Sequence, residues 1–273
     1  MTAQFKGVNV VITGATGVIG STFVKGLVAK GANVGILGRS KDKIIALQDE
    51  IDKDRKQTVA LVADVLDKDA LVQAKQIFNE AFGAIAVLIN GAGGNHPNAT
   101  TDDEMYDATA EQTFFDLTEA GVDNVFKLNY TGTFLPSQVF GKDVVEEEAG
   151  TIINISSMNA FTPLTKIPAY SGAKASVSNF TQWLSTYFAG HIRVNAIAPG
   201  FFETRQNKAL LRNEDGSYSD RAQKILSQTP MNRFGEPEDI LGTLYWLMDH
   251  QLSGFVTGIV VPVDGGFSSY SGV

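Results

Sequence analysis

Several residue types are missing or scarce in this 273-residue chain, and each absence removes a class of function. There is no cysteine, which excludes disulfides, thiolate metal sites and a cysteine nucleophile. The three histidines, His96, His191 and His250, are scattered without metal-ligand spacing, so we expect no metal site. Acidic residues outnumber basic ones by 30 to 22, and no lysine- or arginine-rich run occurs. A nucleic-acid or anionic-membrane partner is therefore not expected.

Long hydrophobic segments are also missing. No apolar run approaches the roughly 18 residues of a membrane-spanning helix. The amino-terminal stretch MTAQFKGVNVVITGATGVIG lacks the charged, apolar and cleavage-site regions of a signal peptide. We therefore expect a soluble cytoplasmic protein. Its hydrophobic residues, 44% of the chain, are enough to bury a sizeable core.

Short β-branched runs alternate along the chain with longer segments whose apolar residues have helical spacing. Because these runs are apolar throughout and separated by helices, they predict an α/β fold: a doubly wound parallel sheet with helices on both faces. They account for nearly the whole chain, so we expect residues 1–273 to form a single domain. The seven predicted strands are Val8–Thr13, Val34–Leu37, Val59–Ala63, Ala86–Asn90, Thr151–Ile155, Val194–Ala198 and Ile259–Val263.

Two connections are longer than such a sheet requires. Residues 91–125 follow the fourth predicted strand, and residues 201–235 follow the sixth. Both leave the carboxyl ends of strands, where open α/β sheets bind their ligands. We expect them to be active-site loops. The stretch 95–126 holds eight acidic residues and no lysine or arginine, so part of the first loop is expected to be a solvated surface.

The turn from the first strand into the first helix, VVITGATGVIG, contains Gly14, Gly17 and Gly20. A Cβ at these positions would block the tight turn, the approach of a pyrophosphate and the contact between helix and strand. The free amides and the dipole of the helix then favour phosphate groups. A glycine-rich turn at the first β–α junction of a parallel sheet predicts a dinucleotide-binding site.

Tyr170 and Lys174 are four residues apart in a predicted helix, so they lie on one face, one turn apart. An ammonium about 5 Å from a phenol, at an effective dielectric constant of roughly 20, favours the phenolate by roughly 3 kcal/mol, or about two pKa units. We therefore expect a lowered pKa for Tyr170 and an acid/base pair. A YxxxK spacing alone is more often a surface contact, so the interpretation depends on the other motifs.

Eight sequence features occur in a fixed order and together resemble the short-chain dehydrogenases/reductases. The resemblance covers essentially the full chain. It implies a seven-stranded Rossmann sheet, a nicotinamide cofactor, oxidation or reduction of a CH–OH group, and usually a homotetramer, whose interface the terminal GGFSSYSGV would help to form. The features are TGATGVIG, ADV at 63–65, NGAG at 90–93, Asn129, Ser157, YSGAK, PGFFET at 199–204 and VDGG at 263–266.

The same resemblance implies a catalytic tetrad of Asn129, Ser157, Tyr170 and Lys174. In the reductive direction Tyr170 would protonate the carbonyl oxygen of the substrate, and Ser157 would hydrogen-bond that oxygen and stabilise its developing charge. Lys174 would lower the pKa of the phenol and hold the ribose hydroxyls. Asn129 would fix a water that links Lys174 to bulk solvent.

The end of the second predicted strand, GILGRS, bears on the choice of cofactor. Gly38 leaves empty the acid position that would bind the ribose of NAD, whereas Arg39 and Ser40 suit the 2′-phosphate of NADP. NADP(H) is therefore favoured, with NAD(H) as the alternative. Besides Tyr170 and Lys174, the cofactor-binding residues implied by the resemblance are Gly14, Thr16, Gly17, Val18, Ile19, Gly20, Arg39, Ser40, Asp64, Val65, Asn90, Gly91, Ala92, Pro199, Gly200, Phe202 and Thr204.

The glycine spacing departs from the single-domain branch of the family, which normally has GxxxGxG. Val18 stands where that pattern has glycine, giving the GxxGxxG spacing of the extended epimerases and dehydratases. Those enzymes carry a larger substrate domain after the YxxxK helix. The segment after Lys174 is too short for one, and it contains PGFFET and VDGG of the short branch. We interpret the spacing as a variant turn.

Three segments, LINGAGGNHPNATT, SSMNAFTPLTKIPAYSGAK and PGFFETRQNKALL, look most like the D-mannonate oxidoreductases (fructuronate reductases). That branch interconverts D-mannonate and D-fructuronate, so the resemblance implies a sugar-acid substrate. Hydrogen bonds to its hydroxyls would come from Asn95, His96 and Asn159. The carboxylate partner would be Lys166 or one of the cations spaced as on a helix in the second loop, namely Arg205, Lys208 and Arg212.

The sequence leaves two alternative functions open. The chain could reduce another ketone or sugar, or it could bind a dinucleotide as a sensor without turnover. Such sensors usually lose the tyrosine or the lysine, and both Tyr170 and Lys174 are present. This favours the enzyme.

Overall fold

A computed structural model describes residues 4–203 and 211–272 of the chain. Within these ranges the backbone forms a seven-stranded parallel sheet in the order β3-β2-β1-β4-β5-β6-β7. β1 pairs with both β2 and β4, so the winding direction reverses at β1. This is the doubly wound Rossmann arrangement expected from the sequence, in which ligands bind at the carboxyl edge beside the reversal.

Every strand begins and ends within one residue of its predicted bounds, because fully apolar runs of this length mark strands that are covered on both faces. The strands are β1 Asn9–Thr13, β2 Asn33–Gly38, β3 Thr58–Val62, β4 Val87–Asn90, β5 Thr151–Ile155, β6 Arg193–Pro199 and β7 Val260–Val263.

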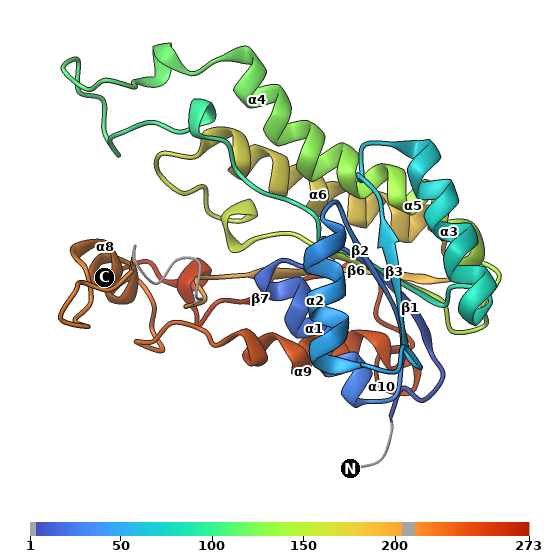
Figure 1. Cartoon of the computed structure of the whole chain (residues 1–273). Coiled ribbons are helices and arrows are strands. Elements are labelled where there is room, and N and C mark those ends of the chain that lie inside the picture. The colour runs from blue at the N-terminus through green and yellow to red at the C-terminus, as the bar shows by residue number, and fades with distance from the viewer. Residues whose placement is uncertain (1–3, 204–210, 273) are drawn as a thin grey trace.

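Helices cover both faces of the sheet, as Figure 1 shows from near its edge. Strand side chains alternate between two cores: Ile12 packs toward one layer, while Val11, its neighbour, packs toward the other. One layer contains α1 Val18–Ala29, α2 Lys41–Ile51 and α9 Leu241–Met248, followed by the short α10 His250–Ser253. The other contains α3 Lys68–Phe82, α4 Glu119–Phe126, α5 Gly132–Val144 and α6 Pro168–Tyr187.

The connection after β4 is shorter than predicted, because α4 already begins at Glu119. Thr118 caps this helix by accepting a hydrogen bond from the amide of Gly121 at 3.0 Å. A Cβ on Gly121 would lie 2.7 Å from the carbonyl oxygen of Asn98, so glycine lets the helix pack closely on the loop. The sequence obscured α4 because it buries only Gly121 and Val125, too few residues for a clear apolar stripe.

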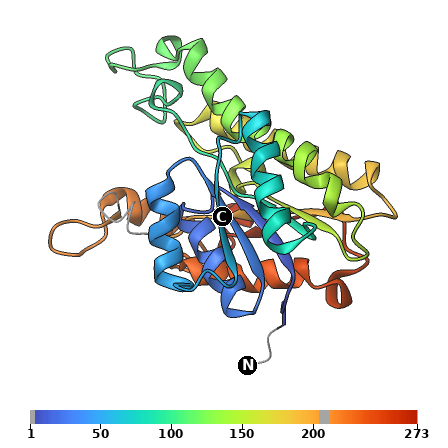
Figure 2. The ribbon, with the colours of Figure 1, turned by 45° about the vertical axis from the view of Figure 1, so that its right-hand side comes forward.

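The second long connection contains one helix among its described residues, α8 Asp220–Ser227, which Ser219 caps. Figures 1 and 2 show both long connections projecting from the same side of the molecule, beyond the carboxyl ends of the strands. Across residues 4–203 and 211–272, no helix has both the length and the apolar composition needed to cross a membrane.

Candidate active site

The four predicted catalytic residues come from three segments that meet at the carboxyl edge of the sheet. β5 ends at Ile155, and Ser157 follows two residues later in an extended conformation. Tyr170 and Lys174 lie in the first two turns of α6. Asn129 lies in a π-helical turn, Lys127–Thr131, between α4 and α5. Such turns are rare and frequently found at functional sites.

The Ser157 hydroxyl lies beside the Tyr170 phenol, where it can hydrogen-bond the phenolate oxygen. Burial raises the pKa of Tyr170 to about 12, and the hydrogen bond from Ser157 opposes this rise without reversing it. The phenol is therefore protonated at neutral pH. It can donate a hydrogen bond and a proton to an oxygen placed beside Ser157.

Lys174 is 3% exposed, and its Nζ donates a hydrogen bond to the carbonyl oxygen of Ile155 at 2.8 Å. Nζ lies 5.7 Å from the centre of the Tyr170 ring. Burial lowers the pKa of Lys174 to about 8, because the ammonium is desolvated without a carboxylate partner. At neutral pH the lysine still carries its charge.

The sequence-based expectation of a lowered Tyr170 pKa is wrong for this structure. Desolvation of the phenolate outweighs the attraction of the Lys174 ammonium, which donates its hydrogen bond to the carbonyl of Ile155. The dielectric constant of roughly 20 used for the pair describes a partly solvated surface and leaves out the burial of both groups.

The Asn129 side chain is fully buried and binds the backbone on two sides. Its Nδ2 donates to the carbonyl oxygens of Gly94 and Val125 at 2.7 and 2.8 Å, and its Oδ1 accepts from the Gly94 amide at 3.2 Å. A Cβ on Gly93 would lie 2.6 Å from Asn129 Oδ1 and 3.0 Å from Lys174 Nζ. The structure therefore brings Asn129 and Lys174 together around Gly93, a residue that sequence reasoning did not assign to the site.

The glycine-rich turn fits a pyrophosphate. Gly14 has a φ of +64°, and a Cβ there would lie 2.7 Å from the carbonyl oxygen of Gly91. A Cβ on Gly20 would lie 2.3 Å from the carbonyl oxygen of Gly14. α1 begins at Val18 after Gly17 and has neither a side-chain cap nor an acidic residue in its first turn. Its first amides, including that of Ile19, are thus left for an anion.

The strand ends beside this turn hold other predicted cofactor residues. The amides of Gly91 and Ala92 both donate to Thr13 Oγ1, at 3.1 and 3.2 Å, so Thr13 shapes this part of the site. Sequence reasoning missed Thr13, because a threonine inside a strand gives no signal of its own. Asn90 is buried, and Asp64 accepts a hydrogen bond from the amide of Leu66 at 2.9 Å. The neighbouring Val65 is buried in the core, with its side chain directed toward Gly132.

At the end of β2, Arg39 is exposed and makes no hydrogen bond or ion pair with the residues that the structure describes. Ser40 caps α2, accepting from the Lys43 amide at 3.4 Å. A Cβ on Gly38 would be in ordinary van der Waals contact with Thr16 Oγ1, at 3.4 Å, so the backbone does not require glycine here. The exposed Arg39 side chain next to it is available to a ligand.

The residues at the end of β6 form another part of the carboxyl edge of the sheet. Pro199 closes the strand, and the Gly200 amide donates to the carbonyl oxygen of Val263 at 2.9 Å. Phe202 is buried in the core and forms a β-bridge with Gly235. Three predicted site residues, Thr204, Arg205 and Lys208, lie outside the described residues.

The predicted substrate residues fall in two places. Asn95 Nδ2 donates to Thr100 Oγ1 at 2.9 Å, and the His96 ring accepts the amide hydrogen of Asn98 at Nδ1, 3.2 Å. A neutral His96 therefore carries its proton on Nε2 and presents a donor. Asn95 and His96 line a hollow of about 460 Å³ in the first loop. Asn159 is 2% exposed, two residues after Ser157, and its Oδ1 has no hydrogen-bond partner among the described residues.

Two of the four candidate carboxylate partners can be placed, and both are engaged. Arg212 forms an ion pair with Glu203 at 2.8 Å and lies 4.0 Å from the centre of the Tyr218 ring. It sits in a β-bridge with Tyr218, so the helical spacing inferred around it is wrong at this position. Lys166 has a φ of +71°, and its Nζ donates to the carbonyl oxygen of Asp102 at 2.5 Å.

Sequence reasoning also missed Lys224, which lies on α8 and forms an ion pair with Glu104 of the first loop. The nearby Lys166 and Arg221 add to the positive charge around Glu104, and the hydrogen bond from Lys224 is the main reason why the pKa of this carboxyl group is lowered. The two long connections are therefore joined by charge. Only tertiary structure shows this, because 120 residues separate the partners.

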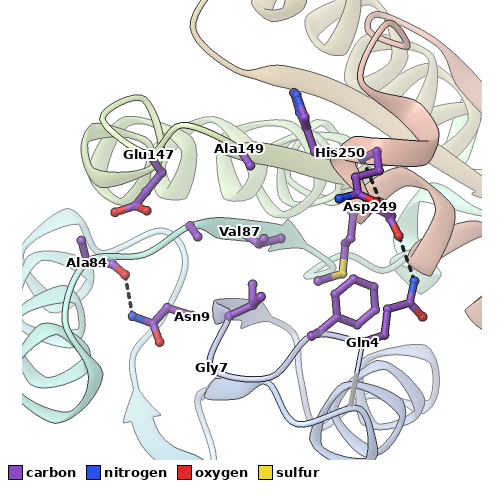
Figure 3. A pocket seen from close by; sticks show the side chains of 14 residues that line it. Gln4, Gly7, Asn9, Ala84, Val87, Glu147, Ala149, Asp249 and His250 are labelled. Carbon is purple, nitrogen blue, oxygen red and sulfur yellow. Dashed lines mark hydrogen bonds between the residues drawn. The ribbon is translucent and has the colours of Figure 1, made fainter. Parts of the chain in front are cut away.

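A different kind of hollow, of about 660 Å³, lies at the opposite, amino edge of the sheet (Figure 3). Here Asn9 Nδ2 donates to the carbonyl oxygens of Phe82 and Ala84, both at 2.8 Å. Gln4 Nε2 donates to the Asp249 carboxylate at 3.1 Å. These hydrogen bonds hold neighbouring segments together, and no predicted catalytic residue lines this hollow.

The chain belongs to the short chain dehydrogenase family, whose profile matches residues 8–215. It is 54% identical over 272 residues to the uncharacterized oxidoreductase UxuB of Bacillus subtilis (strain 168), covering 99% of this chain and 98% of the relative. It is therefore an oxidoreductase of the short-chain dehydrogenase/reductase type, which acts on CH–OH groups with a nicotinamide dinucleotide.

Two solved structures extend the comparison. One, from Haemophilus influenza, has D-mannonate oxidoreductase as a provisional name and contains bound NAD; it is 49% identical, with a TM-score of 0.94 and 99% of each chain covered. The other is a gluconate 5-dehydrogenase from Burkholderia cenocepacia in complex with NADP and tartrate. It is 26% identical, with a TM-score of 0.81, and the match covers 98% of this chain and 97% of that one.

Proposed function

We propose that this enzyme interconverts a sugar-acid ketone and its alcohol, and that the pair is D-fructuronate and D-mannonate. The observation that carries the proposal is the Tyr170 phenol, which lies beside Ser157 and 5.7 Å, measured from its ring centre, from Nζ of the buried Lys174. The first loop, which leaves the same edge of the sheet, contributes neutral hydrogen-bonding groups, and α8 contributes a cation, Lys224, where the two long connections meet. Such surroundings suit a small polyol with one carboxylate.

The proposed reduction uses the protonation states that burial sets. The nicotinamide cofactor supplies the hydride. Tyr170, protonated because its pKa is about 12, donates its hydroxyl proton to the substrate oxygen. Ser157 donates a hydrogen bond to the same oxygen and stabilises the charge that develops on it. Lys174 keeps a positive charge nearby that stabilises the phenolate left after the transfer, and the water proposed at Asn129 is the route by which Tyr170 regains its proton.

The cofactor-binding role rests on space and on donors. Gly14, Gly20 and Gly91 leave room where side chains would collide with backbone, and the α1 amides face that room uncapped. We propose NADP(H) as the preferred cofactor, because Arg39 is exposed beside Gly38 and can pair with a 2′-phosphate. NAD(H) is the second candidate, since the Haemophilus relative contains NAD.

We also propose a homotetramer. Support comes from α6, whose exposed face carries Trp183 and Tyr187, 55% and 66% exposed, with ring centres 5.1 Å apart. An aromatic surface of this kind is typical of a protein interface. Sedimentation at micromolar concentration tests this, and a monomer would contradict it.

The substrate assignment is tested by following NADPH and NADH absorbance with purified D-fructuronate, neutral ketoses, an acyl thioester and an aliphatic ketone. We expect the highest kcat/KM for fructuronate. A better neutral ketone would overturn the sugar-acid assignment while leaving the dehydrogenase assignment intact. Binding of the dinucleotide without turnover of any carbonyl compound would favour a sensor.

A further inference from the structure

A buried chain of hydrogen bonds begins at the backbone of Asn129 and runs over two neighbouring strands on one face of the sheet. Thr133 Oγ1 donates to the carbonyl oxygen of Asn129 at 2.8 Å, and Ser137 Oγ donates to the carbonyl oxygen of Thr133 at 2.8 Å. Asn90 Nδ2 on β4 donates to Ser137 Oγ at 3.0 Å and to Asn154 Oδ1 on β5 at 2.9 Å. The five residues that these hydrogen bonds link are each at most 6% exposed: Thr133, Ser137, Asn90, Asn154 and Thr181.

The last link reaches the helix that carries the tyrosine and the lysine. Asn154 Nδ2 donates to Thr181 Oγ1 at 2.9 Å, and Thr181 donates to the carbonyl oxygen of Val177 at 2.8 Å. Val177 lies on α6, three residues after Lys174. The chain therefore connects the backbone at Asn129 with the helix that holds Lys174, through two strands of the rigid sheet.

Only one arrangement of protons satisfies these contacts. The Ser137 proton goes to the carbonyl of Thr133, so Ser137 can only accept from Asn90. The Thr181 proton goes to Val177, so Asn154 must donate to Thr181 and present its oxygen to Asn90. Both amide hydrogens of Asn90 are thus used, and its buried Oδ1 has no partner among the described residues. A chain with one proton arrangement resists rotation of any member.

The Asn129 end of the chain lies in an irregular part of its helix. In the π-helical turn the Gly132 amide bonds to the carbonyl of Lys127, five residues back, which displaces the regular ladder of donors. Thr133 supplies a side-chain donor to the Asn129 carbonyl there. Threonine hydroxyls that bond four residues back are known to bend helices, so this contact favours the wider turn. The π-helical turn then directs the side-chain amide of Asn129 toward the carbonyl oxygen of Gly94.

We propose that Thr133 and Ser137 are positioning residues for the proton-transfer step: together with Asn90, Asn154 and Thr181 they fix Asn129 relative to Lys174. The inference rests on the proposed role of Asn129 in that step. Thr133 and Ser137 are not among the catalytic or cofactor-binding residues. Loss of their hydroxyl groups should therefore slow proton delivery and leave cofactor binding intact.

Thr133→Val, which keeps the shape and removes the hydroxyl, is the principal test. We expect kcat to fall about 10- to 100-fold, because small displacements of catalytic groups have effects of this size. The dissociation constant for NADPH should stay within twofold. The solvent deuterium isotope effect on kcat should increase, because proton transfer becomes more rate-limiting. Thr133→Ser retains the donor and should recover most of the rate. An unchanged kcat and isotope effect in Thr133→Val would overturn the proposal.

Ser137→Ala removes the next link, and its matched control is Ser185→Ala. Ser185 is another buried helical serine, and it donates to the carbonyl of Gln182 at 2.7 Å outside the chain. We expect Ser137→Ala to lower kcat about fivefold, the equivalent of one neutral hydrogen bond, and Ser185→Ala to leave it unchanged. If Thr133→Val does not fold, this pair decides: equal rates for both serine variants would overturn the proposal.

Asn129→Ala separates failure of this inference from failure of the proposed function. A slow Asn129→Ala with a normal Thr133→Val would sink the positioning chain alone. A normal rate in Asn129→Ala would remove the proposed role of Asn129, and the inference with it. A slow Asn129→Ala with a slow Thr133→Val and an active Thr133→Ser is the expected result.

Discussion

The two edges of the sheet carry similar side chains but use them differently. At the amino edge, Asn9 and Gln4 donate hydrogen bonds to structural groups, namely backbone carbonyls and the carboxylate of Asp249, which caps α10 (Figure 3). At the carboxyl edge, the partly buried Tyr170 and the buried Lys174 have pKa values displaced to about 12 and about 8. Polar groups that are fully paired stabilise a fold, whereas buried titratable groups without a charged partner mark a functional site.

Their different chemistry follows from the direction of the strands. All seven strands are parallel, so the edges are not equivalent, and amino ends of helices meet the carboxyl edge. The amino edge receives the ends of helices and short loops that must be held in place. Variants at the two edges should therefore separate activity from stability.

Tyr170→Phe should have the largest effect on activity. It removes the transferable proton and little else, so we expect kcat to fall about 10²- to 10⁴-fold. The dissociation constant for the cofactor, measured by fluorescence titration, should hardly change. Retention of more than a few per cent of wild-type activity would refute the acid role.

Lys174→Ala should damage both turnover and cofactor binding, because the lysine is proposed to serve both. Lys174→Met should in addition make the fold more stable at pH 7, by on the order of 3 kcal/mol, since the buried ammonium is removed. The folded-state pKa of about 8 lies below the ordinary 10.5, so the unfolded chain binds the extra proton between these values. As the pH rises from 8 to 10.5, the free energy of unfolding of the wild type should therefore increase relative to that of Lys174→Met, and the difference between them should shrink.

Thermal unfolding of the two proteins over that pH range measures how the difference in Tm between them changes. A difference in Tm that does not narrow would show that Lys174 is not charged and buried at neutral pH.

Arg39→Ala should raise the KM for NADPH about 10- to 100-fold, the size of a charge-assisted phosphate contact. The KM for NADH should change little. Arg55→Ala, which removes another arginine outside the site, is a suitable control. Equal effects of Arg39→Ala on both cofactors would show that this residue does not contact the 2′-phosphate.

Glu104→Gln should have a modest effect, because its ion pair with Lys224 is largely exposed. We expect the KM for the sugar acid to change about two- to fivefold, and the difference from wild type to vanish at high salt. Steady-state kinetics at two ionic strengths measures it. A change that persists in high salt would indicate direct contact with the substrate.

Asn9→Ala, at the amino edge, should have the smallest effect on activity. It leaves the carbonyls of Phe82 and Ala84 without their donor and should lower the free energy of unfolding by about 1–3 kcal/mol. Below the melting transition kcat should match that of the wild type. A kcat loss comparable to that of Arg39→Ala would end the distinction between the two edges.

Local patterns in the sequence were sufficient for the sheet, the glycine turn and the placement of Tyr170 and Lys174 on one helical face, whereas Ser157 followed from the resemblance to the short-chain dehydrogenases/reductases. Short apolar runs between helical segments are typical of the strands of a covered parallel sheet, and a glycine whose Cβ would collide with backbone is required where it stands, so both signals depend on a few neighbouring residues. The helix α4 was missed because its buried face is too small to show a period.

Tertiary structure decided the electrostatics and the support of the site. Whether Lys174 lowers the pKa of Tyr170 depends on burial and on the carbonyl of Ile155, and neither is visible in a spacing of four residues. The ion pair of Arg212 with Glu203, the pairing of Lys224 with Glu104 and the chain from Thr133 to Thr181 all join residues that a local pattern cannot relate. The sequence by itself determined which groups are present and on which strand ends they stand. Their charge states and partners were decided by folding, because desolvation and hydrogen bonding depend on what the rest of the chain packs around them.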